Sequence, residues 1–200
     1  MLLDHLAVAG ETLEQASAHI EHALGVPLQG GGKHQTFGTH NQLLGLRDGL
    51  YLEAIAIDPN APKPERTRWF DLDRFSGSPR LTNWICRVSD IDAALSNLPD
   101  EAGKPVELAR GALRWQMAVP PSGRLPFDNL FPALIQWHGD LHPAKMLEDS
   151  GCRLKRLVVF HPDALDLALL LGEMETVVFD TGPAALRAEF ETPHGPRVLE

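Results

Sequence analysis

The segment "GGKHQTFGTHNQLLGLRDGLYLEAIAI" (residues 31–57) decides the fold, because it joins a polar, glycine-bounded run to two alternating apolar segments. The second alternating segment carries a carboxylate, Glu53, among residues that are otherwise typical of a core. A buried carboxylate is costly unless it is paired, hydrogen-bonded or bound to a metal. Glu53 therefore indicates a functional site, although a structural ion pair or an exposed sheet face would fit the same pattern.

Strand periodicity predicts which side chains share a face with Glu53. In residues 50–57, the small and aliphatic side chains fall on one face, and Tyr51, Glu53, Ile55 and Ile57 fall on the other. If the first set packs on a helix, Tyr51 and Glu53 point away from it. Residues 2–9 alternate in the same way, and His5 falls on the face opposite the apolar side chains. We expect His5, Tyr51 and Glu53 to face one hollow.

A strand followed by a helix occurs three times along the chain. After the strand at 2–9, Thr12 and Gln15 form a capping-box pattern, and Gly25 is a typical helix stop. The pattern returns at 81–98 and at 154–172. Later strands are expected near 34–40, 42–47 and 50–57, near 112–119 and 132–138, and in the last part of the chain.

This repetition predicts an α+β fold of βαβββ units. The expected organisation is a first unit at 1–58, a Pro-rich linker at 59–80, a second unit at 81–140 and a third, βαβββ-like C-terminal unit at 150–200. One face of each sheet carries its helix. The other face must be covered by a second unit or must line a pocket.

Composition and net charge disfavour several classes of binding partner. The 200 residues carry a formal net charge of −9, which disfavours nucleic acid and anionic membranes. An anionic substrate would need a local basic group. No segment resembles a signal peptide or a membrane helix, and Cys86 and Cys152 lack a CxxC pattern, so we expect a cytoplasmic protein with reduced cysteines.

Aligning the first two units predicts further residues of the hollow. Placing Ile135 on Leu52 puts Gln136 on Glu53, and aligning the opening strands puts Trp84 on His5. Trp115 and Trp137 are expected as aromatic walls, although aromatic residues more often belong to the core.

The stretches "LLDHLAVAGETLEQA", "GGKHQTFGTHNQLLGL" and "LYLEAIAI" resemble the glyoxalase-like domain family of the vicinal oxygen chelate superfamily. "GALRWQMAVP" and "LPFDNLFPALIQW" resemble its later segments. The most specific part is the H-x-x-x-G-T-x-N run formed by His34, Gly38, Thr39 and Asn41. The resemblance implies curled antiparallel sheets that form a cup.

The resemblance also implies site residues. Metal-using relatives take ligands from the first and last strands of each unit, which implies His5, Glu53 and Gln136 around one divalent metal, Zn, Mn, Fe or Ni. Trp84 would replace a fourth ligand. A metal-free site with His5 or His34 as base and Glu53 as its partner is the alternative.

The implied function is a small-molecule enzyme of isomerase, lyase or dioxygenase type that acts on a substrate with adjacent oxygens. His34 and Glu53 would be catalytic. Substrate contacts would come from Thr39, Asn41, Tyr51, Trp84, Trp115 and Trp137. The alternatives are a metal-free binding protein of the resistance type and a purely structural member of the family.

Two questions of assembly stay open from sequence. Pairing the first unit with the third would bring Arg156 into the cup as an anion clamp, although the first and second units are the preferred pair. The resemblance also allows a homodimer.

Overall fold

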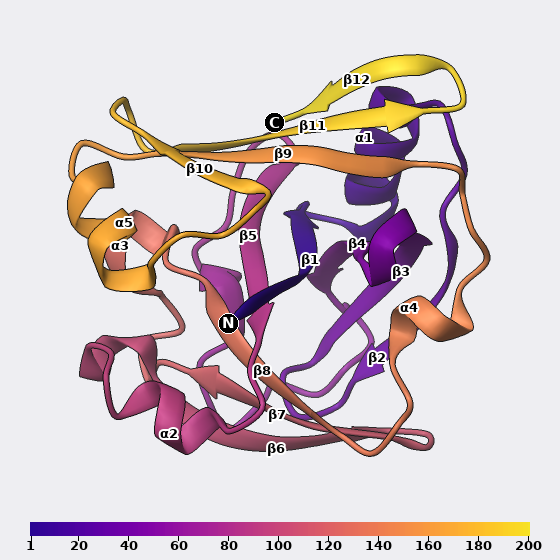
Figure 1. The fold of residues 1–200 in the computed structure, drawn as a ribbon. Helices are drawn as coiled ribbons and strands as arrows, with labels where there is room; N and C mark the ends of the chain where they lie inside the picture. Colours follow the sequence, from indigo (N-terminus) through magenta and orange to yellow (C-terminus); the bar gives the residue numbers. More distant parts are fainter.

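The computed structural model describes residues 1–200 (Figure 1). The strands are β1 (Leu2–Ala9), β2 (Gln29–His34), β3 (Thr39–Gly45), β4 (Tyr51–Ile57), β5 (Arg80–Arg87), β6 (Lys104–Arg110), β7 (Leu113–Val119), β8 (Ala133–His138), β9 (Arg153–Phe160), β10 (Val177–Asp180), β11 (Ala185–Thr192) and β12 (Gly195–Leu199). The α-helices are α1 (Leu13–Leu24), α2 (Ile91–Leu95), α3 (Pro126–Asn129), α4 (Pro143–Met146) and α5 (Ala164–Leu171).

The first helix forms as its caps predict. The Thr12 side chain accepts a hydrogen bond from the backbone N–H of Gln15 at 3.2 Å. The helix ends at Gly25, whose φ of 73° lies in the left-handed region that glycine tolerates. Ala16 and Ile20 on its buried stripe then pack into the core.

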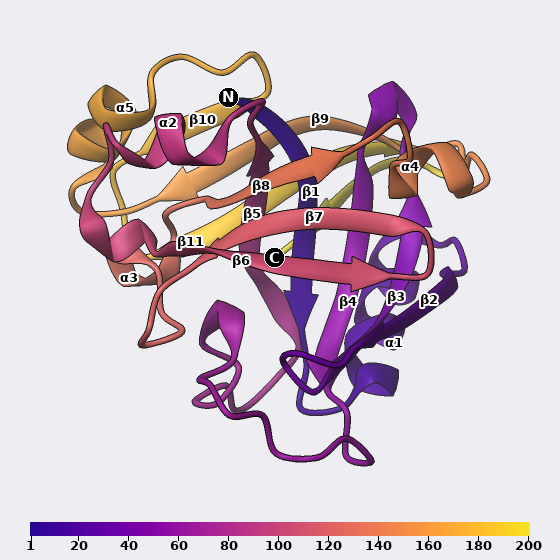
Figure 2. The same ribbon diagram turned by 90° about the horizontal axis from the view of Figure 1, so that it is seen from below.

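Eight strands form one curled sheet in the order β2-β3-β4-β1-β5-β8-β7-β6. In each half the opening strand runs parallel to the last strand, β1 to β4 and β5 to β8. The halves join through the antiparallel pair β1–β5. Figure 2 shows the sheet curling from the β2 edge to the β6 edge. This is the α+β arrangement with a cup-shaped sheet that the sequence predicts.

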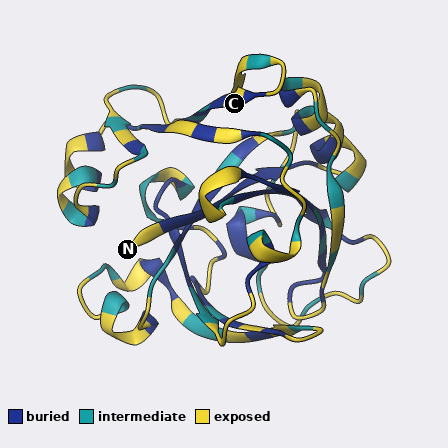
Figure 3. Cartoon of the chain, turned by 45° about the vertical axis from the view of Figure 1, so that its right-hand side comes forward, coloured by how far each residue is buried: buried dark blue, intermediate teal, exposed yellow.

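Helices α1 and α2 and the second sheet lie on the outer face of this curled sheet. Helix α1 contacts β1, β3 and β4, and α2 contacts β6, β7 and β8. Strand β11 of the second sheet contacts β5, and β12 contacts α1. The central strands β1, β4 and β5 are mostly buried, whereas the edge strand β2 and much of the helical surface are exposed (Figure 3). The concave face therefore lies on the side away from the C-terminal sheet.

The C-terminal unit forms the second sheet, in the order β10-β9-β11-β12. Its elements follow the βαβββ order. However, β9 pairs in parallel with β10, the strand directly after α5, and not with the last strand as in the first two units. Arg156 is exposed on β9, and its Nη2 lies 2.8 Å from Oε1 of Glu189. The alternative that placed Arg156 in the cup is wrong, because its sheet packs on the outside.

Several segments differ from the sequence expectations. The strands expected near 34–40 and 42–47 occupy Gln29–His34 and Thr39–Gly45, because the chain turns between them. Strand β6 was not predicted, since Pro105 and its charged residues weaken the pattern. The segment 59–80 buries Trp69, Phe70 and Leu72.

Both cysteines, Cys86 and Cys152, are buried and unpaired, and burial raises the pKa of each thiol. None of the helices has the length and apolar character needed to cross a membrane.

Candidate active site

A cavity of about 30 Å³ lies on the concave face of the curled sheet. At this size, only a small reacting group fits unless side chains move. The lining side chains come from both units, from the segment between them and from the start of α4: His5, His34, Asn41, Leu43, Tyr51, Glu53, Trp69, Phe70, Arg110, Trp115, Met117, Ile135, Trp137 and Pro143.

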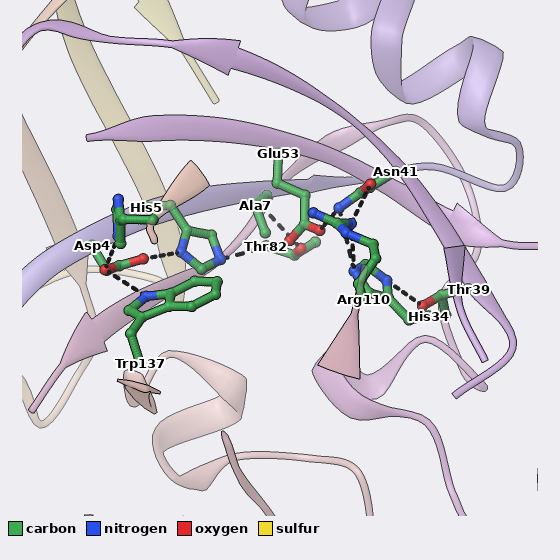
Figure 4. Close-up of polar contacts among 11 residues, drawn as sticks. Asp4, His5, Ala7, His34, Thr39, Asn41, Glu53, Thr82, Arg110 and Trp137 are labelled. Atoms are coloured by element: carbon green, nitrogen blue, oxygen red, sulfur yellow. Dashed lines mark hydrogen bonds and ion pairs between the residues drawn. The ribbon is translucent and has the colours of Figure 1, made fainter. Parts of the chain in front are cut away.

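A β-bulge in β1 places an Asp–His pair in this region. Leu3 pairs with Cys86 and His5 pairs with Ile85, so Asp4 has no partner across the sheet. Such an extra residue interrupts strict alternation and lets consecutive side chains approach each other. Oδ1 of Asp4 lies 2.7 Å from Nδ1 of His5, and both residues are buried (Figure 4).

Asp4 is also held by donors from β8 and from the residue before α4. Its Oδ2 accepts hydrogen bonds from Nε2 of His142 at 2.9 Å and from Nε1 of Trp137 at 3.2 Å. Burial alone would raise the pKa of Asp4, but the hydrogen bonds from His142 and His5 hold it well below its usual range. An ionised Asp4 accepts a hydrogen bond from Nδ1 of His5 and so fixes the orientation of the ring.

The other ring nitrogen of His5 points toward Glu53. Nε2 of His5 lies 3.7 Å from Oε2 of Glu53, and Oε1 of Glu53 accepts a hydrogen bond from Nδ2 of Asn41 at 2.5 Å. The Tyr51 ring stacks on His5 with 4.3 Å between centroids. Burial, with Asp4 and Glu53 nearby, raises the pKa of Tyr51 well above its usual value, so it is a neutral wall.

His34 belongs to a second polar group beside Glu53. Its Nδ1 donates to Oγ1 of Thr39 at 3.1 Å, and its Nε2 accepts from Nη1 of Arg110 at 3.2 Å. Burial lowers the pKa of His34 to about 3, with the charge of Arg110 as the next cause. A neutral ring whose lone pair is already used is a poor general base. In this arrangement His34 positions Arg110 and Thr39, and its role as a base stays a prediction.

Arg110, Asp4 and His142 were all missed in the sequence. Arg110 ends a strand whose pattern gave no signal, and its Nη1 also donates to Oδ1 of Asn41 at 3.2 Å. Asp4 would face away from His5 in a regular strand, so only the bulge brings the two together. His142 is the N-cap of α4, and the short segment before it has no periodicity that would indicate a direction.

Two predicted site residues face the other side of the sheet. Trp84 pairs with Leu6 rather than His5, is fully buried, and donates from Nε1 to the carbonyl oxygen of Leu130 at 2.7 Å. Gln136 accepts a hydrogen bond from the backbone N–H of Ile91 at 2.8 Å, at the start of α2. Their placement in the cup was wrong, because a shift of one residue moves a strand side chain to the opposite face.

The residues present do not fit the expected metal centre. With Gln136 turned to α2, only His5 and Glu53 remain of the implied ligands. The structure contains no group of three or more His, Cys, Asp or Glu side chains arranged to hold an ion. Arg110 lines the same cavity, and its positive charge opposes a divalent cation there.

The remaining predicted contacts lie in or beside the cavity. Trp115 and Trp137 form one wall, with 5.4 Å between their ring centroids. Tyr51 and Asn41 line the cavity, and Thr39 supports His34 from behind.

The family model described as a glyoxalase-like domain matches residues 3–174. No curated protein sequence matches the chain. Among solved structures, a hypothetical protein from Staphylococcus aureus has a TM-score of 0.58 at 15% identity, covering 92% of this chain and 86% of that one.

Two methylmalonyl-CoA epimerases are also among the similar structures. The one from Mycobacterium tuberculosis has a TM-score of 0.44 at 20% identity, covering 70% of this chain and 88% of that one. The one from Streptomyces coelicolor, in complex with 2-nitronate-propionyl-CoA, has a TM-score of 0.45 at 15% identity, covering 70% and 99%. At these identities the likeness is one of fold. The family match, which spans most of the sequence, shows that the chain belongs to the glyoxalase-like domain family.

Proposed function

We propose that this protein is an enzyme that transfers a proton at the carbon next to a carbonyl group, in an isomerase- or lyase-type reaction on a small molecule with adjacent oxygens. The observation that carries the proposal is the pair His5 and Glu53, which face one cavity without a hydrogen bond between them. A separation of 3.7 Å between Nε2 and Oε2 lets a substrate group lie against both side chains.

Glu53 is the proposed base. Its Oε1 is occupied by Asn41, which leaves Oε2 to accept a proton from the substrate carbon. The electron pair of the broken C–H bond then forms the enolate. Asn41 fixes the carboxylate orientation, so the base is positioned before the substrate arrives.

His5 is the proposed stabiliser of the enolate oxygen. Its Nδ1–H is held by Asp4, and a proton on Nε2 can be donated to the oxygen as negative charge develops. Asp4 offsets the positive charge of the imidazolium. Return of the proton from Glu53 to the carbon, at the same or another position, and of the oxygen-bound proton to Nε2 of His5 completes the reaction and restores the site.

A second function, sequestration of an aromatic ligand without chemistry, is favoured by the walls of the cavity. Trp69, Phe70, Trp115 and Trp137 all line it. Offset-stacked or edge-on aromatic contacts would hold a flat ligand well.

Proton exchange with solvent separates the two functions. Candidate 2-oxo acids, hydroxy ketones and aromatic ligands are first tested for binding by calorimetry. Bound compounds are then incubated with the protein in D₂O, and the loss of each C–H signal is followed by NMR. We expect exchange next to the carbonyl group with the unsubstituted protein and a rate at least about 10²-fold lower with Glu53→Gln. Tight binding without exchange, in every compound that binds, would support sequestration instead.

A further inference from the structure

Arg110 brings an unneutralised positive charge into the cup. Its Nη1 donates to two neutral acceptors, Nε2 of His34 and Oδ1 of Asn41, each at 3.2 Å. No carboxylate lies within ion-pair distance of Arg110, and no hydrogen bond of the structure uses its Nε or Nη2. Arg110 is also the only lysine or arginine among the side chains that line the cavity.

The neighbouring backbone leaves room for this guanidinium group. A Cβ atom on Gly32 would lie 2.8 Å from Cδ of Arg110 and 3.1 Å from its Nη1. The backbone N–H of Gly32 donates to Oδ1 of Asn41 at 2.8 Å, the same atom that receives Arg110. Strand β2 thus presents a surface without side chains on which Arg110 lies, while its unused donors stay available.

The position of Arg110 is the boundary between two hollows. On one side lies the small cavity with Glu53, and on the other a groove of about 660 Å³. Leu43, Arg110 and Pro143 line both. The groove continues along the glycines of β2 and past the exposed side chains of Leu141 and Met146, next to α4.

We propose that Arg110 binds a carboxylate of the substrate beside the reacting carbon, and that the uncharged, apolar remainder of the substrate lies in the groove. This inference rests on the proposed function and names its substrate class. Arginine presents two parallel N–H donors that match the two oxygens of a carboxylate. Asn41 connects Arg110 to Glu53, so a carboxylate bound there lies one group away from the base.

The charges of the site favour this occupant. The protein has a net charge of −9, so a local cation is needed to hold an anion. Lys33, which also lines the groove, is already 2.7 Å from Asp58 through its Nζ and Oδ2 atoms. Because the cavity in the cup is much smaller than the groove, only the reacting end of the substrate fits inside the cup.

A matched pair of ligands tests the proposal, 2-oxooctanoate and its methyl ester. They share the ketone and the apolar chain, and only the first has a carboxylate. Calorimetry should show that the unsubstituted protein binds the acid at least about ten-fold more tightly than the ester. In Arg110→Met this preference should disappear while the ester affinity stays within about two-fold.

Two glycine variants provide a test that keeps the charge. Alanine can adopt the backbone conformation of Gly32, but its Cβ would displace the Arg110 side chain. Gly32→Ala should therefore reduce the preference for the acid. Gly30→Ala, on the same strand with no atom near its added Cβ, should keep it. Arg114→Met removes an exposed arginine on β7 that bonds only to backbone oxygens, and it too should keep the preference. If Arg110→Met fails to fold, the two glycine variants decide.

Equal binding of acid and ester, an acid preference that survives both Arg110→Met and Gly32→Ala, or no binding of the acid would each overturn the proposal. These outcomes differ from failure of the proposed function, which is the absence of deuterium exchange in a bound acid. With Glu53→Gln, exchange should be lost while the acid is still preferred to the ester.

Discussion

Lowering the pH should destabilise this protein through His34. The native pKa of His34 is about 3, compared with 6.5 for an unperturbed histidine, because the ring is buried beside Arg110. The unfolded chain therefore binds this proton first as the pH falls. The contribution of His34 to stability is complete above about pH 6.5 and is lost between there and about pH 3.

The magnitude follows from the two pKa values. Between them, each pH unit changes the free energy of unfolding by about 1.4 kcal/mol for one proton. Between pH 7 and pH 5, where the unfolded His34 becomes protonated and the native one does not, the loss is about 2 kcal/mol.

The assay is urea unfolding at pH 5, 6 and 7 of the unsubstituted protein and of His34→Gln. Glutamine can still accept from Arg110 through its side-chain oxygen, but it does not titrate. The variant should lack the loss of about 2 kcal/mol, whereas His40→Gln on β3, with a side chain that is only partly buried, should retain it. Equal pH dependence in the protein and in His34→Gln would show that native His34 takes up its proton over the same pH range as in the unfolded chain, which would refute the hydrogen bond from Arg110 to an unprotonated Nε2.

Three further predictions concern the surroundings of the site. Asp4→Asn should lower the free energy of unfolding by about 3–5 kcal/mol in urea, because it leaves His5 and its other buried donors without their carboxylate; a change below 1 kcal/mol would contradict the buried pair. Tyr51 is the only tyrosine, so absorbance at 295 nm should show no tyrosinate in folded protein at pH 11, and ionisation near pH 10 only after unfolding; a native transition near pH 10 would place its hydroxyl in water. Trp84→Phe should cost about 1–3 kcal/mol through the unpaired carbonyl of Leu130 but leave ligand binding unchanged; weakened binding would return Trp84 to the site.

The first unit was predictable because its strands follow simple alternation. In β4, the small and aliphatic residues pack toward α1 while Tyr51 and Glu53 line the cavity. The capping box at Thr12 and the glycine at position 25 also fixed the first helix correctly. His5 was predicted to share the hollow for the same reason, and it lies there.

The second unit could not be read in the same way, because internal alignment left its register uncertain by one residue. Ile135 and Trp137 face the cavity, so Gln136 between them faces α2. The bulge at Asp4 changes the pairing of β1 with β5, which sets Trp84 opposite Leu6. Pairing between strands far apart in sequence decides both outcomes, and local periodicity does not contain it.

Arg110 shows a second limit. Its strand lies at the edge of the sheet and includes Pro105 and several charged residues, which is typical of edges and weakens the strand signal. Its place in the site also depends on the curl of the whole sheet, which brings β6 close to β2.

The central claim is that proton transfer depends on Glu53 facing His5, and that Gln136 has no part in it. Deuterium exchange into one bound 2-oxo acid, measured side by side for the unsubstituted protein, Glu53→Gln and Gln136→Ala, tests this directly. We expect the exchange rate to fall by about 10²–10⁴-fold in Glu53→Gln and to change less than about two-fold in Gln136→Ala. Full exchange in Glu53→Gln, or its loss in Gln136→Ala, would contradict the account.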